Sequence, residues 1–536
     1  MLLNARQAAV RLGFLTLPEF VDLTQHSFAT MDRLPKYQGH LYNWYSTHTL
    51  QPLPPITVSS VDSGNLCASL YTMRSGADSF LNMPLLSHEL FMGLRAYWEI
   101  LREFKEIPAS AAPHPLPPPG AGPQQWCDWT LAIATLPDFS NVPEIQQPCP
   151  NEPAWWLHET CARIRAIASL VTGYAPWLLP EFEPLRQIPA LGLHADDLFA
   201  PLKNAAAFAD QLENRLARAW ATLNITEDES GISLIVEKLR AELPAVSARL
   251  RALEAEIQRI SVEALQKAVE MDFTFLAQES RQLLSIGYEV ETGKLYEACY
   301  DMLASEARIA TFIAVSRGEL PRPGWFKMGR THTAAFGRFI LLSWTGTMFE
   351  YLMPALWMRS YPGTLIERSL ASAVEVQRRF ARSLKLPWGI SESGHGQTDD
   401  AGHYRYQAFG IPQIALKWDS TAGPVISPYS TLLALGINAT EALRNLHRME
   451  NAGWTGAYGF YESADFTASR KKPVLVKEWM AHHQGMALLA ILNLLDNNVV
   501  QEWFHANREF QANELLLHEK SIRPAILKAE LRRNAI

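Results

Sequence analysis

The glutamate at position 306 stands in a context suited to acid–base chemistry. It lies in LYEACYDMLASEARIATFIAV (295–315), where apolar residues recur at the three- and four-residue steps of one helical face. Glu306 takes a position at which that pattern calls for a buried leucine. Burial disfavours the ionised carboxylate and raises its pKa, as a general acid requires. An ion pair with a buried arginine, or a helix cap, would explain the same placement.

Three further glutamates occur in motifs whose neighbours suit a ligand site. Glu350 lies in the strongly apolar helix predicted for SWTGTMFEYLMP, either as a substrate contact or as a buried carboxylate satisfied by nearby donors. Glu392 follows Trp388 in LPWGISESGHG, a glycine-flanked loop that lets backbone approach a ligand and offers an indole for stacking on a sugar. Glu462 stands beside two tyrosines in YGFYESADF.

Two such carboxyl groups are what cleavage of a glycosidic bond needs. One protonates the leaving oxygen, and the other attacks the anomeric carbon or activates water. A buried Glu306 on a helix and a Glu392 in a glycine-rich loop would supply the pair.

Metal and cofactor chemistry finds little support in the motifs. His395, Asp399 and His403 are four residues apart, but the neighbouring glycines weaken the helix that would align them. His482 and His483 are adjacent and cannot both face one ion from a regular helix. HExxH, P-loop, GxGxxG and GxSxG motifs are absent. We therefore predict neither a metal site nor a cofactor.

Composition limits the partners and the compartment. A formal net charge of −7 argues against binding to nucleic acid. Five cysteines without a CxxC pair fit a reducing compartment, and the N-terminus lacks the layout of a signal peptide. The most apolar long run, 339–358, contains Glu350 and is interpreted as a core helix rather than a membrane span. A cytoplasmic location is expected.

The elements that must position these residues are mostly helices. Helix is predicted over residues 1–37, followed by an aromatic and polar loop over 39–66 and further helix to about residue 106. The Pro-rich segment that begins at 107 is interpreted as a linker. The apolar stripe of 236–260 is interrupted by Pro244, which favours a helical hairpin or an appended bundle over a long coiled coil.

The C-terminal half alternates helices with loops. A short strand pair is expected in 271–295, and the chain is divided into 1–106, 107–154, 155–270 and 271–536. Successive helix pairs with functional loops predict an all-α fold, an (α/α)6 toroid or barrel with an additional helical segment and a few short strands. The helices expected here are 296–315, 334–358, 364–385, 428–448, 478–496 and 509–519.

At these motifs the sequence resembles a known family, the glucan-cyclising middle domain of bacterial cyclic β-1,2-glucan synthases, which is glucoamylase-like. The resembling stretches include GHLYNWYSTHTLQPLPP, VSSVDSGNL, YDMLASEAR, SWTGTMFEYLMP, PWGISES, SPYSTLLAL, YGFYES and MAHHQGM, and they extend from residue 39 to residue 519. The resemblance implies an (α/α)6 barrel that acts on linear β-1,2-glucan.

The resemblance also implies roles for individual residues. The glutamate of SEAR, Glu306, corresponds to the general acid/base, and the glutamate of GISES, Glu392, corresponds to the nucleophile. The implied reaction retains configuration: a glycosyl-enzyme forms on Glu392, and a hydroxyl of the same chain then closes a ring. The residues that the resemblance places in the substrate pocket are Trp44, Tyr45, Asp62, Glu350, Trp388, Tyr406, Tyr461, Glu462, His482 and Gln484.

The sequence departs from the family next to the nucleophile. Gly394, His395 and Gly396 follow GISES where family members commonly have Ala-Tyr-Asn, and Gln413 with a KWDS turn (417–420) replaces small residues and a Lys-Arg pair. These changes leave two acceptors open. A sugar hydroxyl would make the protein a cyclising transglycosylase, and water would make it an endo-β-1,2-glucanase.

A non-catalytic glucan-binding module is the third reading. The expected partner is β-1,2-glucan as oligosaccharide or polysaccharide. No membrane segment is expected in this chain, which would be an excised domain, on the cytoplasmic side of the inner membrane within a larger membrane-bound synthase, or a free-standing relative.

Overall fold

The protein is described by a computed structural model that covers residues 1–104, 108–111, 113–118, 120–140, 153–188, 191, 193, 198–222, 231–417 and 423–520. It divides into two compact units. Unit 1 comprises Met1–Ala5, Phe28–Ser75 and the described residues from Glu263 onward; unit 2 comprises Arg6–Ser27 and the described residues of Gly76–Val262. These boundaries differ from the sequence-based division, because the N-terminal helices do not belong to one unit.

Unit 2 is helical, with buried aromatic residues from α4, α5 and α6 in its core. Trp98 packs on Trp129 and Phe139, at ring-centroid distances of 4.9 and 5.7 Å. The helices that lie wholly or largely here are α1 (Leu2–Arg11), α2 (Leu17–Arg33), α4 (His88–Glu103), α5 (Pro123–Ala134), α6 (Pro137–Ser140), α7 (Pro153–Tyr174), α8 (Glu183–Arg186), α10 (Leu202–Thr222) and α11 (Ile232–Glu270).

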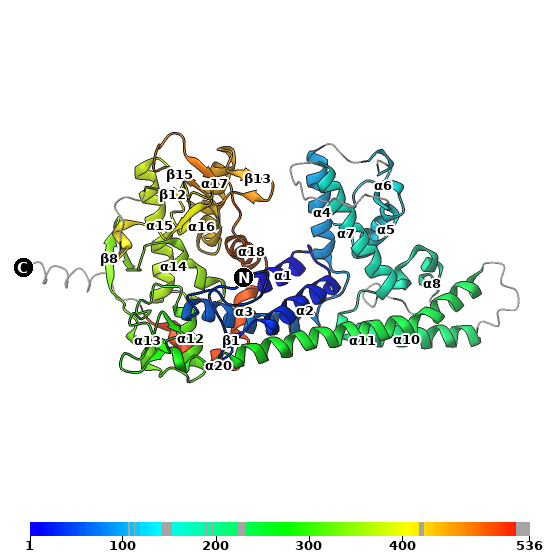
Figure 1. The fold of residues 1–536 in the computed structure, drawn as a ribbon. Helices are drawn as coiled ribbons and strands as arrows, with labels where there is room; N and C mark the ends of the chain where they lie inside the picture. The colour runs from blue at the N-terminus through cyan, green and yellow to red at the C-terminus, as the bar shows by residue number, and fades with distance from the viewer. Residues whose placement is uncertain are drawn as a thin grey trace, which may run out of the picture. The chain divides into compact units, whose positions relative to one another are not determined.

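Unit 1 combines helices with short antiparallel strands (Figure 1). Its helices are α3 (Ser60–Phe80, to Ser75), α12 (Arg308–Ser316), α13 (Pro323–Lys327), α14 (Met348–Leu352), α15 (Leu365–Leu384), α16 (Pro428–Leu433), α17 (Leu435–Asn451), α18 (Ala481–Leu495), α19 (Val499–His505) and α20 (Arg508–Ala512). Its strands are β1 (Lys36–Tyr37), β2 (His40–Leu41), β3 (Thr57–Ser59), β4 (Ala277–Gln278), β5 (Leu283–Leu284), β6 (Gly287–Glu289), β7 (Lys294–Leu295), β8 (His332–Ala335), β9 (Arg338–Leu341), β10 (Ser393–Thr398), β11 (Tyr404–Gln407), β12 (Val425–Ile426), β13 (Thr455–Gly456), β14 (Gly459–Phe460), β15 (Ser463–Asp465) and β16 (Val474–Val476).

Helices α15 and α17 hold the loop that leads to Glu392. Gln377 on α15 accepts the N–H of Ile390 at 2.9 Å and donates to its carbonyl at 2.8 Å. Asn445 on α17 accepts the N–H of Trp388 at 3.1 Å and donates to its carbonyl at 2.8 Å. The side chain of Ile390 is buried in an apolar core beneath the loop. Two amide side chains therefore add to the backbone hydrogen bonds that the loop makes with Ser427 and Met348.

Two predicted helices are only partly correct. Of 296–315, only α12 from Arg308 onward is helical, because the preceding residues pair with the β5–β6 segment: the N–H of Ile286 donates to Ala298 and that of Tyr300 donates to Leu284, both at 3.0 Å. Glu306 therefore lies in the turn before α12 and not on a helical face. Of 334–358, the first part is the β8–β9 hairpin, whose turn at Phe336 and Gly337 has positive φ at both residues.

Three further predictions need correction. Pro244 does not interrupt α11, which is continuous and packs against α10 through the Ser247 hydroxyl, 2.6 Å from a carboxylate oxygen of Asp210. The buried apolar residues of α11 from Leu239 to Ile260 stabilise the helix enough to offset the backbone hydrogen bond that Pro244 cannot donate. The predicted loop 39–66 ends where α3 begins at Ser60, and α5 and α6 lie inside the predicted linker 107–154, of which 141–152 are outside the described residues.

The mostly helical class with a few short strands is confirmed. The predicted helices 364–385, 428–448 and 478–496 correspond to α15, to α16 with α17, and to α18. Strands also occur in 271–295 as predicted, although Phe273 and Phe275 lie outside them. Within the described residues, every helix is too short or too polar to cross a membrane.

Candidate active site

Glu306 is held by the arginine that begins α12. The Arg308 guanidinium donates to the backbone carbonyls of Ser305, Glu350 and Tyr351 at 3.3, 3.1 and 2.7 Å, which fixes the Glu306 turn against α14. The Oε2 atom of Glu306 is buried and has no hydrogen-bond partner among the described residues. Burial, reinforced by the negative charges of nearby carboxylates, raises the pKa of Glu306 well above its usual value.

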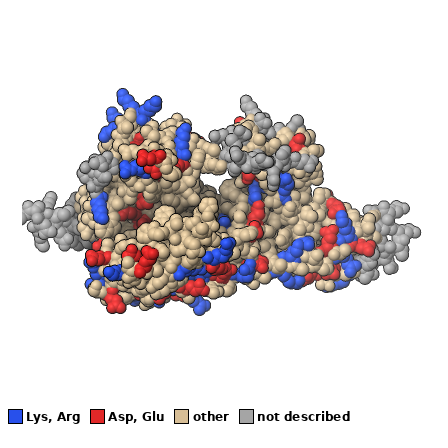
Figure 2. Space-filling view, viewed as in Figure 1, with Lys and Arg blue, Asp and Glu red and all other residues tan. Residues whose placement is uncertain are grey.

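The carboxylates around Glu306 come from distant parts of the chain. Glu392, Glu350 and Asp62 all repel its ionised form, in that order of strength, while Arg308 opposes them weakly. Asp62 lies in the first turn of α3 and is exposed. Figure 2 shows acidic side chains at the floor of a hollow in this face of the molecule. The structure thus brings four sequence-distant carboxyl groups within electrostatic range of one another.

Glu392 has the hydrogen-bond donor that Glu306 lacks. The Tyr406 hydroxyl, on β11, donates to Oε1 of Glu392 at 2.6 Å, and the Tyr429 hydroxyl donates to its backbone carbonyl at 2.7 Å. Burial raises the pKa of Glu392, the hydrogen bond from Tyr406 opposes that rise, and Glu350 and Asp62 add to it. Donation to a carboxylate oxygen favours the ionised form.

Glu350 is a fully satisfied buried carboxylate. It caps α14 with Thr347, and its oxygens accept from the N–H groups of Trp344 and Thr345 and from the Thr345 hydroxyl at 2.8–3.3 Å. The sequence left open a substrate contact or a satisfied carboxylate, and the geometry matches the second. Its negative charge still acts on Glu306.

A chain of polar groups continues from Glu392 through the partly exposed Tyr406 to the buried His483 and Glu462. The His483 ring lies 2.9 Å from both carboxylate oxygens of Glu462 through Nδ1 and 3.3 Å from the Tyr406 hydroxyl through Nε2. Burial raises the pKa of Glu462 to about 7 and lowers that of His483 to about 3. Burial therefore disfavours the charged form of both the Glu462 carboxyl group and the His483 imidazole. His482 is exposed, with Nε2 at 3.4 Å from the Tyr406 hydroxyl.

Gly394 permits the approach of Glu462 to this cluster. Its N–H donates to Oε1 of Glu462 at 3.2 Å, and a Cβ at this position would lie 3.3 Å from Cγ of Glu462 and 3.0 Å from Cγ1 of Val476. The glycine that departs from the family pattern therefore stands where β10 packs closely against β15 and β16.

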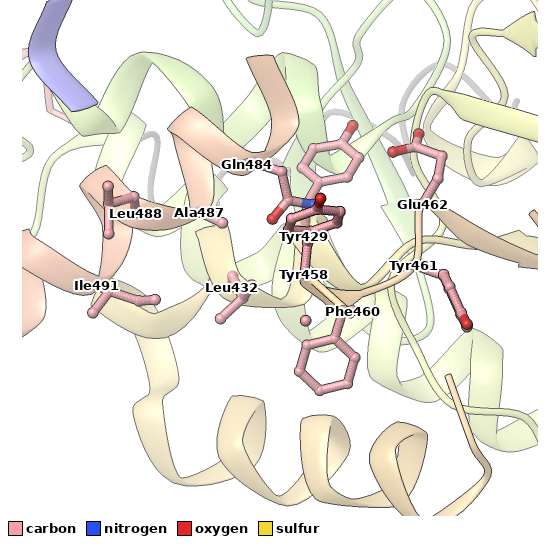
Figure 3. Close-up of a pocket in the computed structure, with 11 residues that line it drawn as sticks. Tyr429, Leu432, Tyr458, Phe460, Tyr461, Glu462, Gln484, Ala487, Leu488 and Ile491 are labelled. Carbon is pink, nitrogen blue, oxygen red and sulfur yellow. The ribbon is translucent and has the colours of Figure 1, made fainter. Parts of the chain in front are cut away.

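A pocket opens beside Glu462 (Figure 3). It measures about 260 Å³ and is lined by aromatic and aliphatic side chains with a few polar groups, a composition that suits a sugar ring. Tyr461 and Gln484, both expected in a substrate pocket, line it together with Glu462. Its other lining residues are Tyr429, Leu432, Tyr458, Gly459, Phe460, Ala487, Leu488 and Ile491.

Three predicted pocket residues have different surroundings. The Trp44 side chain is 67% exposed. The Tyr45 hydroxyl donates to the Pro35 carbonyl at 2.7 Å, so it stabilises its own loop. Trp388 is buried and lines a separate pocket between α15 and α17.

The sequence motifs gave no indication that Tyr429 and Tyr300 lie near the carboxylates, and they assigned His483 no role in the site. Tyr429 stacks on His483 at a centroid distance of 3.6 Å and holds the Glu392 backbone. Tyr300 lies close enough to Glu306, Asp62 and Glu392 for their charges to raise its pKa further above the value that burial gives. SPYSTLLAL and YDMLASEAR contained both tyrosines, but nothing in these motifs singles out the hydroxyl.

Among the described residues, no group of three His, Cys, Asp or Glu side chains has the arrangement of a metal site.

Comparison with known proteins finds similarity to a glucan synthase and to the structures of glucanases. Over 523 residues the chain is 33% identical to cyclic β-(1,2)-glucan synthase NdvB of Rhizobium meliloti, a match that covers 96% of this chain and 17% of that protein. Among solved structures, an endo-β-1,2-glucanase from Talaromyces funiculosus with sophorose has 11% identity and a TM-score of 0.44, covering 96% of this chain and 93% of that chain. A β-1,2-glucanase from Parabacteroides distasonis has 14% identity and a TM-score of 0.39, covering 84% and 60%.

The family model named Glycoamylase, which describes a glucoamylase, matches residues 299–508. This range contains Glu306, Glu350, Glu392 and Glu462. Residues 299–508 are thus similar to the glucoamylase family model, and the chain is similar over most of its length to one segment of a cyclic β-(1,2)-glucan synthase.

Proposed function

We propose that the chain is a retaining transglycosylase that cyclises linear β-1,2-glucan, with Glu306 as general acid/base and Glu392 as nucleophile. The observation that carries the proposal is the contrast between the two carboxyl groups. Glu306 has a buried oxygen without a partner, whereas Glu392 accepts a hydrogen bond from Tyr406. Opposite surroundings of this kind support Glu306 as the acid and Glu392 as the ionised carboxylate of a catalytic pair.

In the first step, Glu306 donates its proton to the glycosidic oxygen while the Glu392 carboxylate attacks the anomeric carbon. The C–O bond to the leaving chain breaks, that chain departs with a free hydroxyl, and a glycosyl ester forms on Glu392. The ionised Glu306 then removes the proton from the 2-hydroxyl at the far end of the same glucan. That oxygen attacks the anomeric carbon and releases Glu392 as a carboxylate.

The acceptor separates this proposal from its alternative. Water in place of the sugar hydroxyl would make the protein an endo-β-1,2-glucanase, a reading favoured by the altered residues Gly394, His395 and Gly396 beside the nucleophile. Incubation with linear glucan distinguishes the two, because cyclisation yields rings without new reducing ends and hydrolysis yields new reducing ends.

Replacement of the two glutamates tests the roles themselves. We expect Glu306→Gln to lower kcat on linear glucan by roughly 10²–10⁴-fold with little change in glucan binding, because proton donation and not affinity is removed. Weakened binding with normal turnover would contradict the acid role. If both Glu306→Gln and Glu392→Gln retain normal turnover, other residues carry the catalysis. A wild-type protein that binds glucan without any turnover would be a non-catalytic glucan-binding module.

Azide rescue distinguishes the two glutamates by stereochemistry. With an aryl glycoside of a short β-1,2-glucan as substrate, azide should reactivate Glu306→Ala by attacking the glycosyl-enzyme, giving a β-glycosyl azide. It should reactivate Glu392→Ala by direct attack, giving an α-glycosyl azide. The opposite anomers, determined by NMR, would exchange the two roles, and an inverting mechanism would give no β-azide from either variant.

The location of the chain and the larger protein to which it would belong are also proposals. The chain spans 17% of the length of its synthase relative. We infer that it acts on the cytoplasmic side of the inner membrane as part of a larger membrane-bound synthase. Antibody detection of the native polypeptide in membrane and soluble fractions tests this inference.

A further inference from the structure

A second pocket, separate from the carboxylate cluster, gathers positive charge between α15 and α17. It measures about 330 Å³. The residues that line it are Arg378, Arg382, Lys385, Leu386, Trp388, Glu441, Arg444, Asn445 and Arg448. Five cationic side chains and a single carboxylate therefore converge on one concave site, in a chain whose overall formal charge is −7.

Neighbouring carboxylates satisfy only part of this charge. Arg378 pairs with Glu441 at 2.6 Å and with Glu375, and Arg444 pairs with Glu441 as well. For Arg382, Lys385 and Arg448, no carboxylate of the described residues lies within ion-pair distance. Arg448 donates instead to the backbone carbonyls of Leu386 and Lys385, both at 3.0 Å.

We propose that this pocket binds a small multivalent oxyanion, a phosphate group either free or carried by an organic molecule. Guanidinium groups bind phosphate through paired, charge-assisted hydrogen bonds, and four of the five cations are arginines. The concave shape and small volume suit such a group better than they suit a polymer. Lys385, at the C-terminal cap of α15 with φ of 61°, completes the rim.

The pocket adjoins the segment that leads to Glu392. Asn445 lines the pocket and holds both backbone groups of Trp388, and Arg448 holds the carbonyls at the end of α15. An oxyanion that contacts Arg382, Lys385 and Arg448 would therefore link the end of α15 to α17. Bound anion should slow the local opening of 385–392.

Titration calorimetry of the full chain with inorganic phosphate, pyrophosphate and phenyl phosphate, in NaCl of matched ionic strength, tests the proposal. We expect saturable binding, with pyrophosphate tighter than phosphate. The double variant Arg382→Gln/Arg444→Gln should weaken binding by at least about tenfold. Arg368→Gln, an exposed arginine on the same helix outside the pocket, removes one charge and should leave binding unchanged.

If phenyl phosphate binds more tightly than inorganic phosphate, the ligand is a phosphate group carried by an organic molecule. If it binds equally or more weakly, the ligand is free phosphate. Hydrogen exchange then locates the site: pyrophosphate should protect 385–392 in the wild type and not in the double variant. The proposal is overturned if none of the three anions binds saturably, or if Arg368→Gln weakens binding as much as the double variant. These measurements require no glucan, so their outcome is independent of the proposed enzymatic activity.

Discussion

At the scale of single residues, the hydrogen bond from the Tyr406 hydroxyl favours the ionised form of Glu392. Tyr406 donates to Glu392 at 2.6 Å and opposes the rise in pKa that burial causes. Tyr406→Phe removes the donor, so the pKa of Glu392 should rise and the acidic limb of the pH–rate profile should move to higher pH. On that limb kcat/KM should fall by roughly 10–100-fold.

Tyr404→Phe is the matched control, because it removes a hydroxyl two residues earlier on the same strand. Its pH profile should match that of the wild type. An unchanged acidic limb in Tyr406→Phe would show that the hydrogen bond does not support the charge of Glu392.

The buried carboxyl of Glu306 should also destabilise the fold at neutral pH. Its pKa is raised in the folded state, so the unfolded chain releases this proton first as the pH rises above about 4.5. Stability that is present below pH 4.5 is lost as the pH rises toward the folded-state pKa, and Gln cannot ionise. Glu306→Gln should therefore raise Tm at pH 7 by a few degrees, on the order of 2–4 °C.

Thermal unfolding at two pH values measures this effect. At a pH below about 4.5 the carboxyl is protonated in both states, so the two proteins should unfold at nearly the same temperature. A lower Tm for Glu306→Gln at pH 7 would mean that the ionised carboxylate is stabilised, contrary to its assignment as the acid.

At the scale of elements, the loop that cradles Glu350 depends on a close approach of backbone. A Cβ on Gly410 would overlap the backbone carbon of Gly346 and the carbonyl oxygen of Thr345. Gly410→Ala should displace the loop whose N–H groups hold Glu350, lowering the free energy of unfolding by about 1–3 kcal/mol and reducing activity.

Gly436→Ala provides the comparison, because a Cβ there meets open space at the start of α17. It should be neutral or stabilising by roughly 0.5–1 kcal/mol. Denaturant unfolding of both variants checks the prediction, and equal stability of the two would show that the loop accommodates the methyl group.

The elements predicted correctly from the sequence are those whose burial pattern is local. In α15, the cap residue Thr364 and buried residues such as Leu370, Val374 and Gln377 recur at helical spacing. Residues 296–307 show the same spacing but are not helical, because their backbone groups pair with a segment that the local pattern does not contain. Long-range pairing of this kind is invisible to a periodicity argument.

The predicted site residues show the same contrast between local sequence patterns and long-range packing. The motifs predicted roles for Glu306 and Glu392, whose carboxyl groups lie within electrostatic range of each other, although the helical face proposed for Glu306 was wrong. They also placed Trp388 beside the substrate, whereas its side chain lies against α15 and α17. A sequence motif fixes which residues are near one another along the loop, and the packing of Asn445 and Gln377 decides which side of the loop faces the carboxylates.

At the scale of the whole molecule, the charge balance suits a neutral polymer. The formal charge of −7 offers no attraction for a polyanion, and the carboxylate cluster is largely buried, where salt screens it little. The uncharged glucan proposed as substrate would be recognised through hydrogen bonds and stacking at short range. The basic pocket between α15 and α17 has a surplus of positive charge.

Ring closure, if it is the reaction, should compete with intermolecular transfer in a way that depends on glucan concentration. Both ends of a cyclising chain belong to one molecule, and a flexible chain presents its own end at an effective concentration of order millimolar. Below that concentration of chains, rings should dominate; above it, linear products of altered length should increase. Mass spectrometry in H₂¹⁸O measures all outcomes, since a ring is one water lighter than the linear glucan of equal length. Linear products carrying ¹⁸O at every concentration would establish hydrolysis instead.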